Sequence, residues 1–404
     1  MVFIRILILF VAWLPAAETM PAGVQPGMWR GVLTTNGGEL PFNFETKYRD
    51  GKLIMEIING EERIVADEIR MAEDSVIIKL PVFDSEFRLR YTPQSLTGLW
   101  INHSRKVNNV FPFTAEYGNK YRFTDEAVRP VDNVSGHWEV DFSKGTSDSS
   151  KAVGIFRQTG NHLTGTFLTT SGDYRYLEGT VQGNLLMLSC FDGSHAFLFK
   201  ATIDPAGVLN GMYYSGNHWQ EPWIAHRNAT YELPDPSSLI SLKPGFDKLA
   251  FSFPDLNGKM VSLADPQFQD KVVIVQVMGS WCPNCMDEVA YFSPLYDQYQ
   301  SKGLEIIGLA YEKATGEKAV ENVKRLRQLF NVHYTMLIAG QPGADAINTL
   351  PMLSGMFAYP TTFFIDRKGN LRKSYSGING PATGSLYEKW KDDTRGMVEK
   401  LLAE

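Results

Sequence analysis

Cysteine is scarce in this sequence, with three residues among 404. A fold held together by disulfides would carry more of them, so this chain has to rely on hydrophobic cores. Two of the three, Cys282 and Cys285, form a C-x-x-C pair. A disulfide across two intervening residues closes too small a loop to constrain the unfolded chain, so redox chemistry explains the pair better than structural cross-linking.

Clusters of positive charge, long apolar runs and groups of metal ligands are also missing. The formal net charge is -6 and no stretch concentrates lysine and arginine, which argues against a nucleic-acid-binding surface. After the N-terminus, no segment is apolar over the roughly 20 residues that a membrane-spanning helix needs. The seven histidines are scattered, so we expect no metal and no organic cofactor.

The N-terminus has the pattern of a secretory signal peptide. Arg5 precedes an apolar run over residues 6–14, and small residues follow at Ala16 and Ala17. This pattern predicts a signal peptide at 1–17, with an uncleaved anchor as the alternative. We therefore expect an exported protein of the periplasm or cell envelope, soluble or peripherally attached.

The segment that follows is rich in short alternating runs typical of antiparallel strands. Residues 87–91 alternate strictly between apolar and charged side chains, and turn pairs such as Asn59-Gly60 recur at short spacing. A weak internal repeat relates residues 27–29 to residues 136–138. These features predict an all-β region, either two sandwiches or two halves of one barrel, with β-rich units at 18–129 and 130–232.

A proline- and serine-containing linker at 233–245 separates the β region from a part of different character. From residue 246 to 404, apolar runs of strand length alternate with longer helical patterns, which is typical of a layered α/β domain. The expected strands are 249–253, 260–263, 271–277, 304–311, 334–339, 361–365 and 371–375, and the expected helices run from the cysteine pair to about residue 300, over 318–330 and over 387–402.

The cysteine pair lies where the buried strand 271–277 passes into a helix. A thiol in the first turn of a helix faces the positive end of the helix dipole, so its thiolate is stabilised. Cys282, nearer the helix end, is predicted to be the attacking nucleophile. Cys285, one turn further in, is predicted to be the resolving thiol.

The residues Trp281-Cys282-Pro283-Asn284-Cys285 after an apolar strand resemble the thioredoxin superfamily. The hairpin at 255–259 and Glu312 in Ala-Tyr-Glu resemble the exported TlpA/ResA-like branch. The resemblance covers 246–404 and leaves the β region out. It implies a thiol–disulfide oxidoreductase that cycles between a Cys282–Cys285 disulfide and a dithiol. The implied substrate is a disulfide-containing protein. The implied electron source is an upstream thiol donor, either membrane-bound or soluble.

The same resemblance implies roles for residues around the pair. Pro360 matches the family's cis-proline, which lies against the cysteines and presents backbone to the substrate. Glu312 matches a buried acid that would shuttle a proton to or from Cys285. Trp281 would cover the pair. Substrate contacts are expected from Pro283, Asn284 and Tyr359.

The sequence departs from the thioredoxin pattern at three places. Gln276 stands where thioredoxins carry a buried aspartate, and Ala290 stands where the first helix usually carries proline. Asp287 and Glu288 fall in the first turns of that helix, where they are expected to oppose formation of the Cys282 thiolate. That expectation favours a reductant over an oxidant.

Two other functions remain open from the sequence. A peroxidase of the peroxiredoxin kind shares the fold, but Val275 and Gly279 stand where its proline and threonine would be. Alternatively, the β region is a partner-binding surface and the redox domain is secondary. Cys190, in an apolar strand, is expected to be a buried structural thiol.

Overall fold

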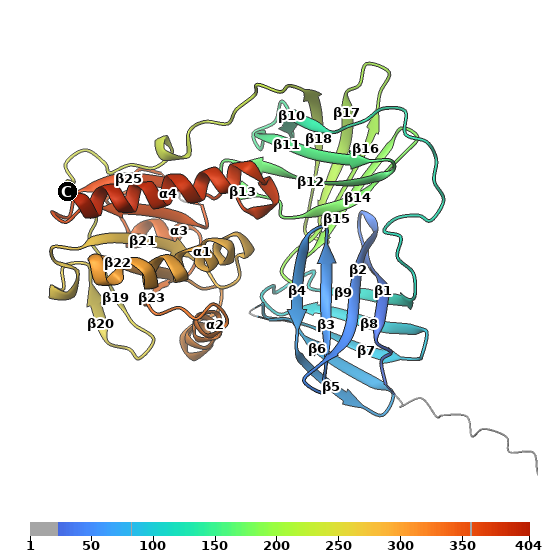
Figure 1. Ribbon diagram of the computed structural model, residues 1–404, viewed down its shortest axis with the longest axis horizontal. Helices are drawn as coiled ribbons and strands as arrows, with labels where there is room; N and C mark the ends of the chain where they lie inside the picture. Colours follow the sequence, from blue (N-terminus) through green and yellow to red (C-terminus); the bar gives the residue numbers. More distant parts are fainter. Residues whose placement is uncertain (1–22, 82, 356–357) are drawn as a thin grey trace, which may run out of the picture.

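Two antiparallel β-sheets and one α/β domain make up the part of the chain that the computed structural model describes, residues 23–81, 83–355 and 358–404 (Figure 1). The predicted signal peptide at 1–17 lies outside these residues. Within them, none of the helices combines the length and the apolar character needed to cross a membrane.

The first sheet is formed by the described residues of 27–117. Its strands lie in the order β4-β3-β2-β1-β9-β8-β7-β6-β5, each antiparallel to its neighbours. The strands are β1 (Gly27–Thr35), β2 (Gly38–Arg49), β3 (Lys52–Asn59), β4 (Glu62–Ala66), β5 (Glu68–Ala72), β6 (Ser75–Lys79), β7 (Ser85–Tyr91), β8 (Ser95–Asn102) and β9 (Val110–Tyr117). Alternate residues of β9 are buried, as expected for a strand with one solvent-facing side.

The second sheet, residues 136–227, closes on itself. Strand β11 pairs with β10 on one side and with β12 on the other, so the ladder has a barrel-like form. Its strands are β10 (Gly136–Phe142), β11 (Ser150–Thr159), β12 (His162–Thr169), β13 (Gly172–Asp173), β14 (Leu177–Gln182), β15 (Leu185–Phe191), β16 (Ala196–Ile203), β17 (Leu209–Ser215) and β18 (Trp219–Arg227). Aromatic rings fill its interior, with Phe167 stacked on Phe199 at 4.5 Å.

The two sheets share a core at the end of β15. Phe191 is the last residue of β15, and its ring packs among aromatic residues of the first sheet, with its centre 4.5 Å from that of Phe42 and 5.0 Å from that of Trp100. Beside it, the buried Arg122 donates to Asn59. The β region is therefore two hydrogen-bonded sheets with a common apolar boundary.

The α/β domain has a mixed sheet in the order β23-β22-β21-β24-β25. Strands β21, β22 and β23 are parallel, whereas β24 runs antiparallel to β21 and forms a hairpin with β25. The strands are β21 (Val272–Met278), β22 (Leu304–Tyr311), β23 (Thr335–Gly340), β24 (Thr361–Ile365) and β25 (Leu371–Ser376), preceded by the hairpin of β19 (Ser252–Pro254) and β20 (Met260–Ser262). The helices are α1 (Pro283–Tyr299), α2 (Gly316–Leu329), α3 (Ala344–Thr349) and α4 (Ser385–Ala403), with short 3-10 turns η1 (Pro236–Ser238), η2 (Pro266–Phe268), η3 (Gln300–Lys302) and η4 (Pro381–Thr383).

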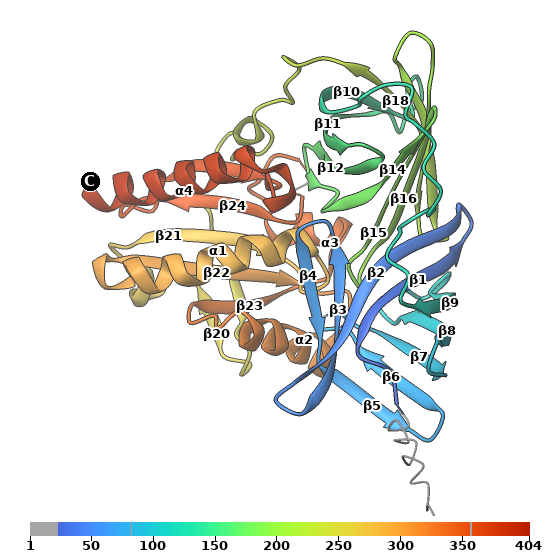
Figure 2. The same ribbon diagram turned by 45° about the vertical axis from the view of Figure 1, so that its right-hand side comes forward.

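Strand β21 is buried on both faces, which explains its continuous apolar sequence. Val272 and Ile274 belong to the core that contains α1 and α4, whereas Val273 and Val275 belong to the core on the opposite face. Figure 2 shows α1 and α4 lying along the sheet. The alternation also turns Gln276 toward the α1 side.

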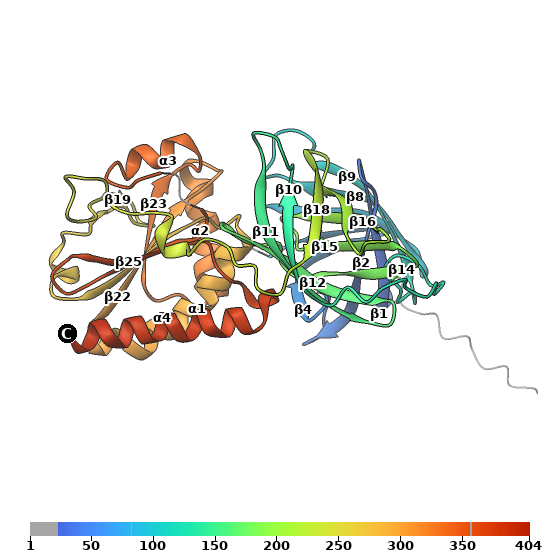
Figure 3. The same ribbon diagram turned by 90° about the horizontal axis from the view of Figure 1, so that it is seen from above.

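The predicted fold class is confirmed: a β-rich N-terminal region precedes a thioredoxin-like α/β domain. The expected strands and helices of the α/β domain appear within a few residues of their predicted bounds, whereas α3 was not expected. Figure 3 shows the two parts side by side, with the linker crossing between them. The end of the α/β domain that carries the cysteines faces the β region.

Candidate active site

The cysteine pair begins helix α1, as the strand-to-helix pattern predicts. Cys282 is the N-cap residue, and its Sγ accepts a hydrogen bond from the Cys285 backbone N–H at 3.2 Å. The same Sγ lies 3.3 Å from the Tyr359 carbonyl oxygen, to which the thiol can donate. The sulfur is therefore held at the N-terminal end of α1, as the sequence pattern predicts.

The two cysteines differ in access and in acidity. Cys282 keeps 6% of its surface exposed, whereas Cys285 is fully buried behind it. Burial raises the pKa of the Cys285 thiol well above its usual value, and the hydrogen bond and charge of Cys282 raise it further. Cys285 therefore stays protonated while Cys282 is the thiol that an incoming molecule can reach.

Trp281 and the Tyr359–Pro360 segment both lie beside Cys282. The Tyr359–Pro360 peptide bond is cis. The Trp281 indole N–H donates to the Tyr311 carbonyl oxygen at 2.9 Å, and its ring centre lies 5.2 Å from that of Tyr359. Lys313 lies 4.2 Å above the Trp281 ring, and burial lowers the Lys313 pKa to about 8. These contacts fix the indole beside the pair.

Glu312 lies beneath the loop that precedes the cysteines. Its carboxylate accepts hydrogen bonds from the Ser280 backbone N–H at 2.7 Å and from the Ser280 hydroxyl at 2.6 Å. Burial raises the Glu312 pKa, and these hydrogen bonds partly oppose the rise. Glu312, Lys313 and Asn322 line a polar cavity of about 130 Å³. Glu312 therefore anchors the loop through Ser280, the residue that precedes Trp281.

Glu288 is a second buried acid that the sequence reasoning treated only as a charge in the first turns of the helix. Its side chain is fully buried and accepts hydrogen bonds from the Gln276 amide at 2.8 Å and the Thr362 hydroxyl at 2.7 Å. Burial raises the Glu288 pKa to about 7. Its charge is also among the causes that raise the Cys285 pKa. The spacing in the sequence could have indicated this role. Glu288 lies three residues after Cys285, which places both side chains on one face of the helix.

Asp287, the neighbouring acid, is neutralised by the β region. Arg175, which follows β13, forms an ion pair with Asp287, and both side chains are largely buried. The same guanidinium pairs with Glu62 of β4. The predicted opposition of Asp287 to the thiolate is therefore reduced, because the positive charge of Arg175 lies beside it.

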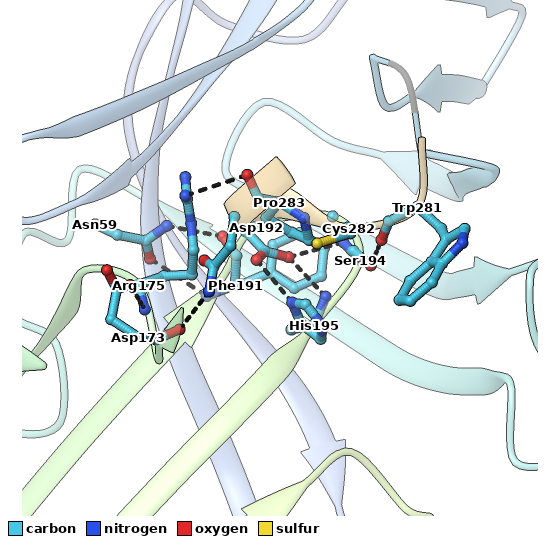
Figure 4. A network of polar contacts seen from close by, with 12 residues as sticks. Asn59, Asp173, Arg175, Phe191, Asp192, Ser194, His195, Trp281, Cys282 and Pro283 are labelled. Atoms are coloured by element: carbon cyan, nitrogen blue, oxygen red, sulfur yellow. Dashed lines mark hydrogen bonds and ion pairs between the residues drawn. The ribbon is translucent and has the colours of Figure 1, made fainter. Parts of the chain in front are cut away.

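Further hydrogen bonds fasten the cysteine loop, residues 279–285, to the second sheet (Figure 4). Ser194 donates to the Trp281 carbonyl oxygen at 3.0 Å, and Arg175 donates to the Pro283 carbonyl oxygen at 3.5 Å. The Asn284 amide donates to the Asp173 carbonyl oxygen at 3.0 Å. Residues on both sides of Cys282 are thus held by the β region, which no sequence motif indicates.

A cleft of about 710 Å³ remains between the second sheet and the cysteine loop, and we call it the interdomain cleft. The α/β domain contributes Trp281, Cys282, Pro283, Asn284 and Tyr359, and the β region contributes residues 149–151, 169–175, His195, Phe197 and Tyr231, with Pro234 from the linker. All three residues expected to contact substrate, Pro283, Asn284 and Tyr359, line it together with Cys282. Chemistry at Cys282 would take place inside this cleft.

Other candidate groups lie away from the pair. Cys190 is fully buried in the core of the second sheet, and burial raises its thiol pKa well above the usual value. Among residues 23–81, 83–355 and 358–404, no group of three or more metal-ligating side chains is close enough to hold a metal ion.

Known proteins resemble the C-terminal part of this chain. Residues 246–374 match the AhpC/TSA family. The thiol-disulfide oxidoreductase ResA of Bacillus thuringiensis is 34% identical over 128 residues, which cover 31% of this chain and 66% of that protein. The thiol:disulfide interchange protein DsbE of Escherichia coli is 29% identical over 183 residues, covering 45% of this chain and 87% of that protein.

One solved structure of another protein aligns with the same part of this chain. The crystal structure of a thiol:disulfide interchange protein, a thioredoxin family protein from Chlorobium tepidum TLS, aligns with a TM-score of 0.30 and 22% identity. The alignment covers 40% of this chain and 99% of that one. The β region is extra to the family match.

Proposed function

We propose that this chain is an exported thiol–disulfide oxidoreductase that reduces disulfides of protein substrates through a Cys282/Cys285 dithiol cycle. The observation that carries the proposal is the geometry of the pair. Cys282 Sγ stands at the start of α1 on the wall of a cleft, and Cys285 is buried directly behind it. The similarity to ResA and DsbE, both named for thiol–disulfide chemistry, supports it.

The first step is attack on the substrate. The Cys282 thiolate attacks one sulfur of the substrate disulfide, a bond forms between them, and the substrate S–S bond breaks. The second substrate sulfur leaves as a thiolate and takes up a proton. The residues around the reacting sulfur contact the substrate or pack against the pair; they are Trp281, Pro283, Asn284, Tyr359 and Pro360.

The second step is resolution by Cys285. Its thiol has to lose a proton before its sulfur can attack Cys282 Sγ, and its raised pKa makes this the step that needs a base. Glu288 and Glu312 are buried acids of the α/β domain that act on the pair or on its loop. Glu288 acts on Cys285 through its charge, and Glu312 contacts the loop through Ser280. Resolution forms the Cys282–Cys285 disulfide and releases the reduced substrate.

The direction of electron flow depends on whether the protein stabilises the dithiol form or the disulfide form of the pair. Oxidants of this fold stabilise the reduced pair as a thiolate. Here two acids, Asp287 and Glu288, lie in the first turns of α1, where negative charge opposes a thiolate at the pair, and Arg175 offsets only the charge of Asp287. This supports a reductant, which an upstream thiol donor must return to the dithiol form with two electrons. The leader pattern at 1–17 supports export to the periplasm or cell envelope.

Insulin reduction by purified protein tests the proposal. The full chain should turn over insulin disulfides with a thiol donor, and Cys282→Ser should abolish turnover. Cys285→Ser should accumulate a mixed disulfide at Cys282. Unchanged turnover in Cys282→Ser would refute the assignment. Peroxide consumption without disulfide turnover would instead favour the peroxidase alternative, which Val275 and Gly279 do not support.

A further inference from the structure

The β region covers the face of the cysteine loop from which a substrate would approach. Hydrogen bonds from Ser194 and Arg175 hold the carbonyl groups on each side of Cys282, and Asn284 is bonded to the Asp173 backbone. The Arg175–Asp287 ion pair adds a fastening at the first turns of α1. A partner with a folded surface could not lie flat on the loop without displacing these contacts.

The interdomain cleft leaves a restricted route to Cys282. Its volume of about 710 Å³ lies within the range of roughly 300 to 1,000 Å³ typical of pockets for small molecules or short chains. One wall carries Cys282 with Trp281 and Tyr359, and the other carries residues of the second sheet. The cleft therefore has room for a short stretch of chain around a disulfide and not for a folded domain.

The wall opposite Cys282 is built rigidly. Asp192, which is almost fully buried, accepts hydrogen bonds from the backbone N–H groups of Ser194 and His195 and lies 3.0 Å from His195 Nδ1. The His195 ring stacks on Phe197 with centres 4.6 Å apart. Ser194 of the same turn contacts Trp281, so this wall is fixed relative to the cysteine loop (Figure 4). The lining combines aromatic rings with polar and charged side chains, Lys151, Asp173 and Arg175 among them, so both the backbone and the side chains of a peptide segment can find partners there.

We propose that the interdomain cleft is the substrate-binding site and that it selects a disulfide carried on a short, extended chain. The disulfide belongs to an unfolded protein segment or to a small peptide, which share this chemistry, whereas disulfides fixed on the surface of a folded protein are excluded. The proposal deepens the proposed function and rests on it, because it presupposes attack by Cys282. It assigns the β region a part in substrate selection.

The experiment compares one disulfide in two contexts. A small domain with a single surface disulfide is presented folded, and as a destabilised variant that keeps the disulfide but is unfolded. Glutathione disulfide is the third probe. The full chain carrying Cys285→Ser reports the rate of mixed-disulfide formation at Cys282. We expect the unfolded variant to react at least about tenfold faster than the folded domain, because the reacting sulfurs must come within about 3.5 Å in line.

A bulky substitution in the cleft wall provides the second arm. Thr170 lines the cleft and is partly exposed, so Thr170→Trp should fill it and slow the reaction with the unfolded variant by about tenfold or more. Thr97→Trp, at an exposed position of β8, is the matched control and should change nothing. Alkylation of reduced Cys282 by iodoacetamide, a much smaller probe, should be slowed less.

The outcomes separate the two proposals. Equal rates for the folded domain and its unfolded variant, or an unchanged rate in Thr170→Trp, would overturn the selection by the cleft. Reaction of glutathione disulfide as fast as the unfolded segment supports a small-peptide source, and a slower reaction supports a protein segment. If neither the unfolded variant nor glutathione disulfide reacts with Cys282 at all, the thiol–disulfide assignment itself fails.

Discussion

Arg175 and Asp287 form a largely buried ion pair that joins the β region to the first turns of helix α1. Arg175 also pairs with Glu62, so one guanidinium links the first sheet, the second sheet and the α/β domain. The site is therefore a composite one. The charge beside the cysteines is set by residues more than a hundred positions away in the chain.

Replacing Arg175 should destabilise this junction. Arg175→Met leaves two carboxylates without their partner in a place with little solvent, which typically costs about 3–5 kcal/mol. The measurement is urea unfolding followed by tryptophan fluorescence. Arg157→Met is the matched control, because its pair with Glu61 is exposed on both sides and should be worth no more than about 1 kcal/mol. Equal effects of the two substitutions would show that the junction does not stabilise the fold.

The stability of the protein should fall as pH rises through the titration of Glu288. Its pKa is raised from 4.5 to about 7, so the folded chain binds this proton more tightly than the unfolded chain does. The free energy of unfolding therefore begins to fall above about pH 4.5, and the fall is complete above about pH 7. Its size is on the order of 3 kcal/mol. Unfolding of Glu288→Gln at pH 5 and pH 8 should lack this difference, whereas Glu321→Gln, at an exposed position, should keep it. A slope that persists in Glu288→Gln would assign it to another group.

The same acid should control the resolution step. If the Glu288 carboxylate draws the proton from Cys285, the rate of mixed-disulfide resolution rises as pH increases through about 7. Glu288→Gln should slow that step by at least about tenfold and remove this rise. Rapid acid quench followed by mass spectrometry measures the mixed disulfide. Glu312→Gln is the comparison, and a larger effect there than at Glu288 would identify Glu312 as the proton shuttle.

Much of the α/β domain could be predicted from its sequence because local pattern determines it. The apolar run of β21 and the helical spacing of α1 are properties of neighbouring residues. The partners of Asp287 and Glu288 could not be predicted, since Arg175 and Thr362 reach them only through tertiary packing. The strands of the β region could be predicted from their alternating pattern. The closure of the second sheet could not, because it depends on the pairing of β11 with both β12 and β10.

Alkylation should distinguish the three cysteines. Cys282 retains some exposure, whereas Cys285 and Cys190 are fully buried and have raised thiol pKa values. Iodoacetamide at neutral pH should therefore modify Cys282 in the reduced native protein and leave the other two unmodified. Peptide mass spectrometry identifies the site. Denaturation before labelling is the control and should expose all three, and modification of Cys190 in the native protein would contradict its burial.

Phe191 should couple the β core to the active site. Its ring packs against Phe42 and Trp100, so Phe191→Ala should cost about 3–5 kcal/mol through the cavity it leaves. The turn that begins at the next residue carries Ser194, which bonds to Trp281 beside Cys282. A loosened turn should therefore also speed alkylation of Cys282, measured under native conditions. Phe246→Ala, at an exposed position at the start of the α/β domain, is the control for loss of an aromatic ring. Lower stability with an unchanged alkylation rate would mean that the β core supports the fold without holding the cysteine loop.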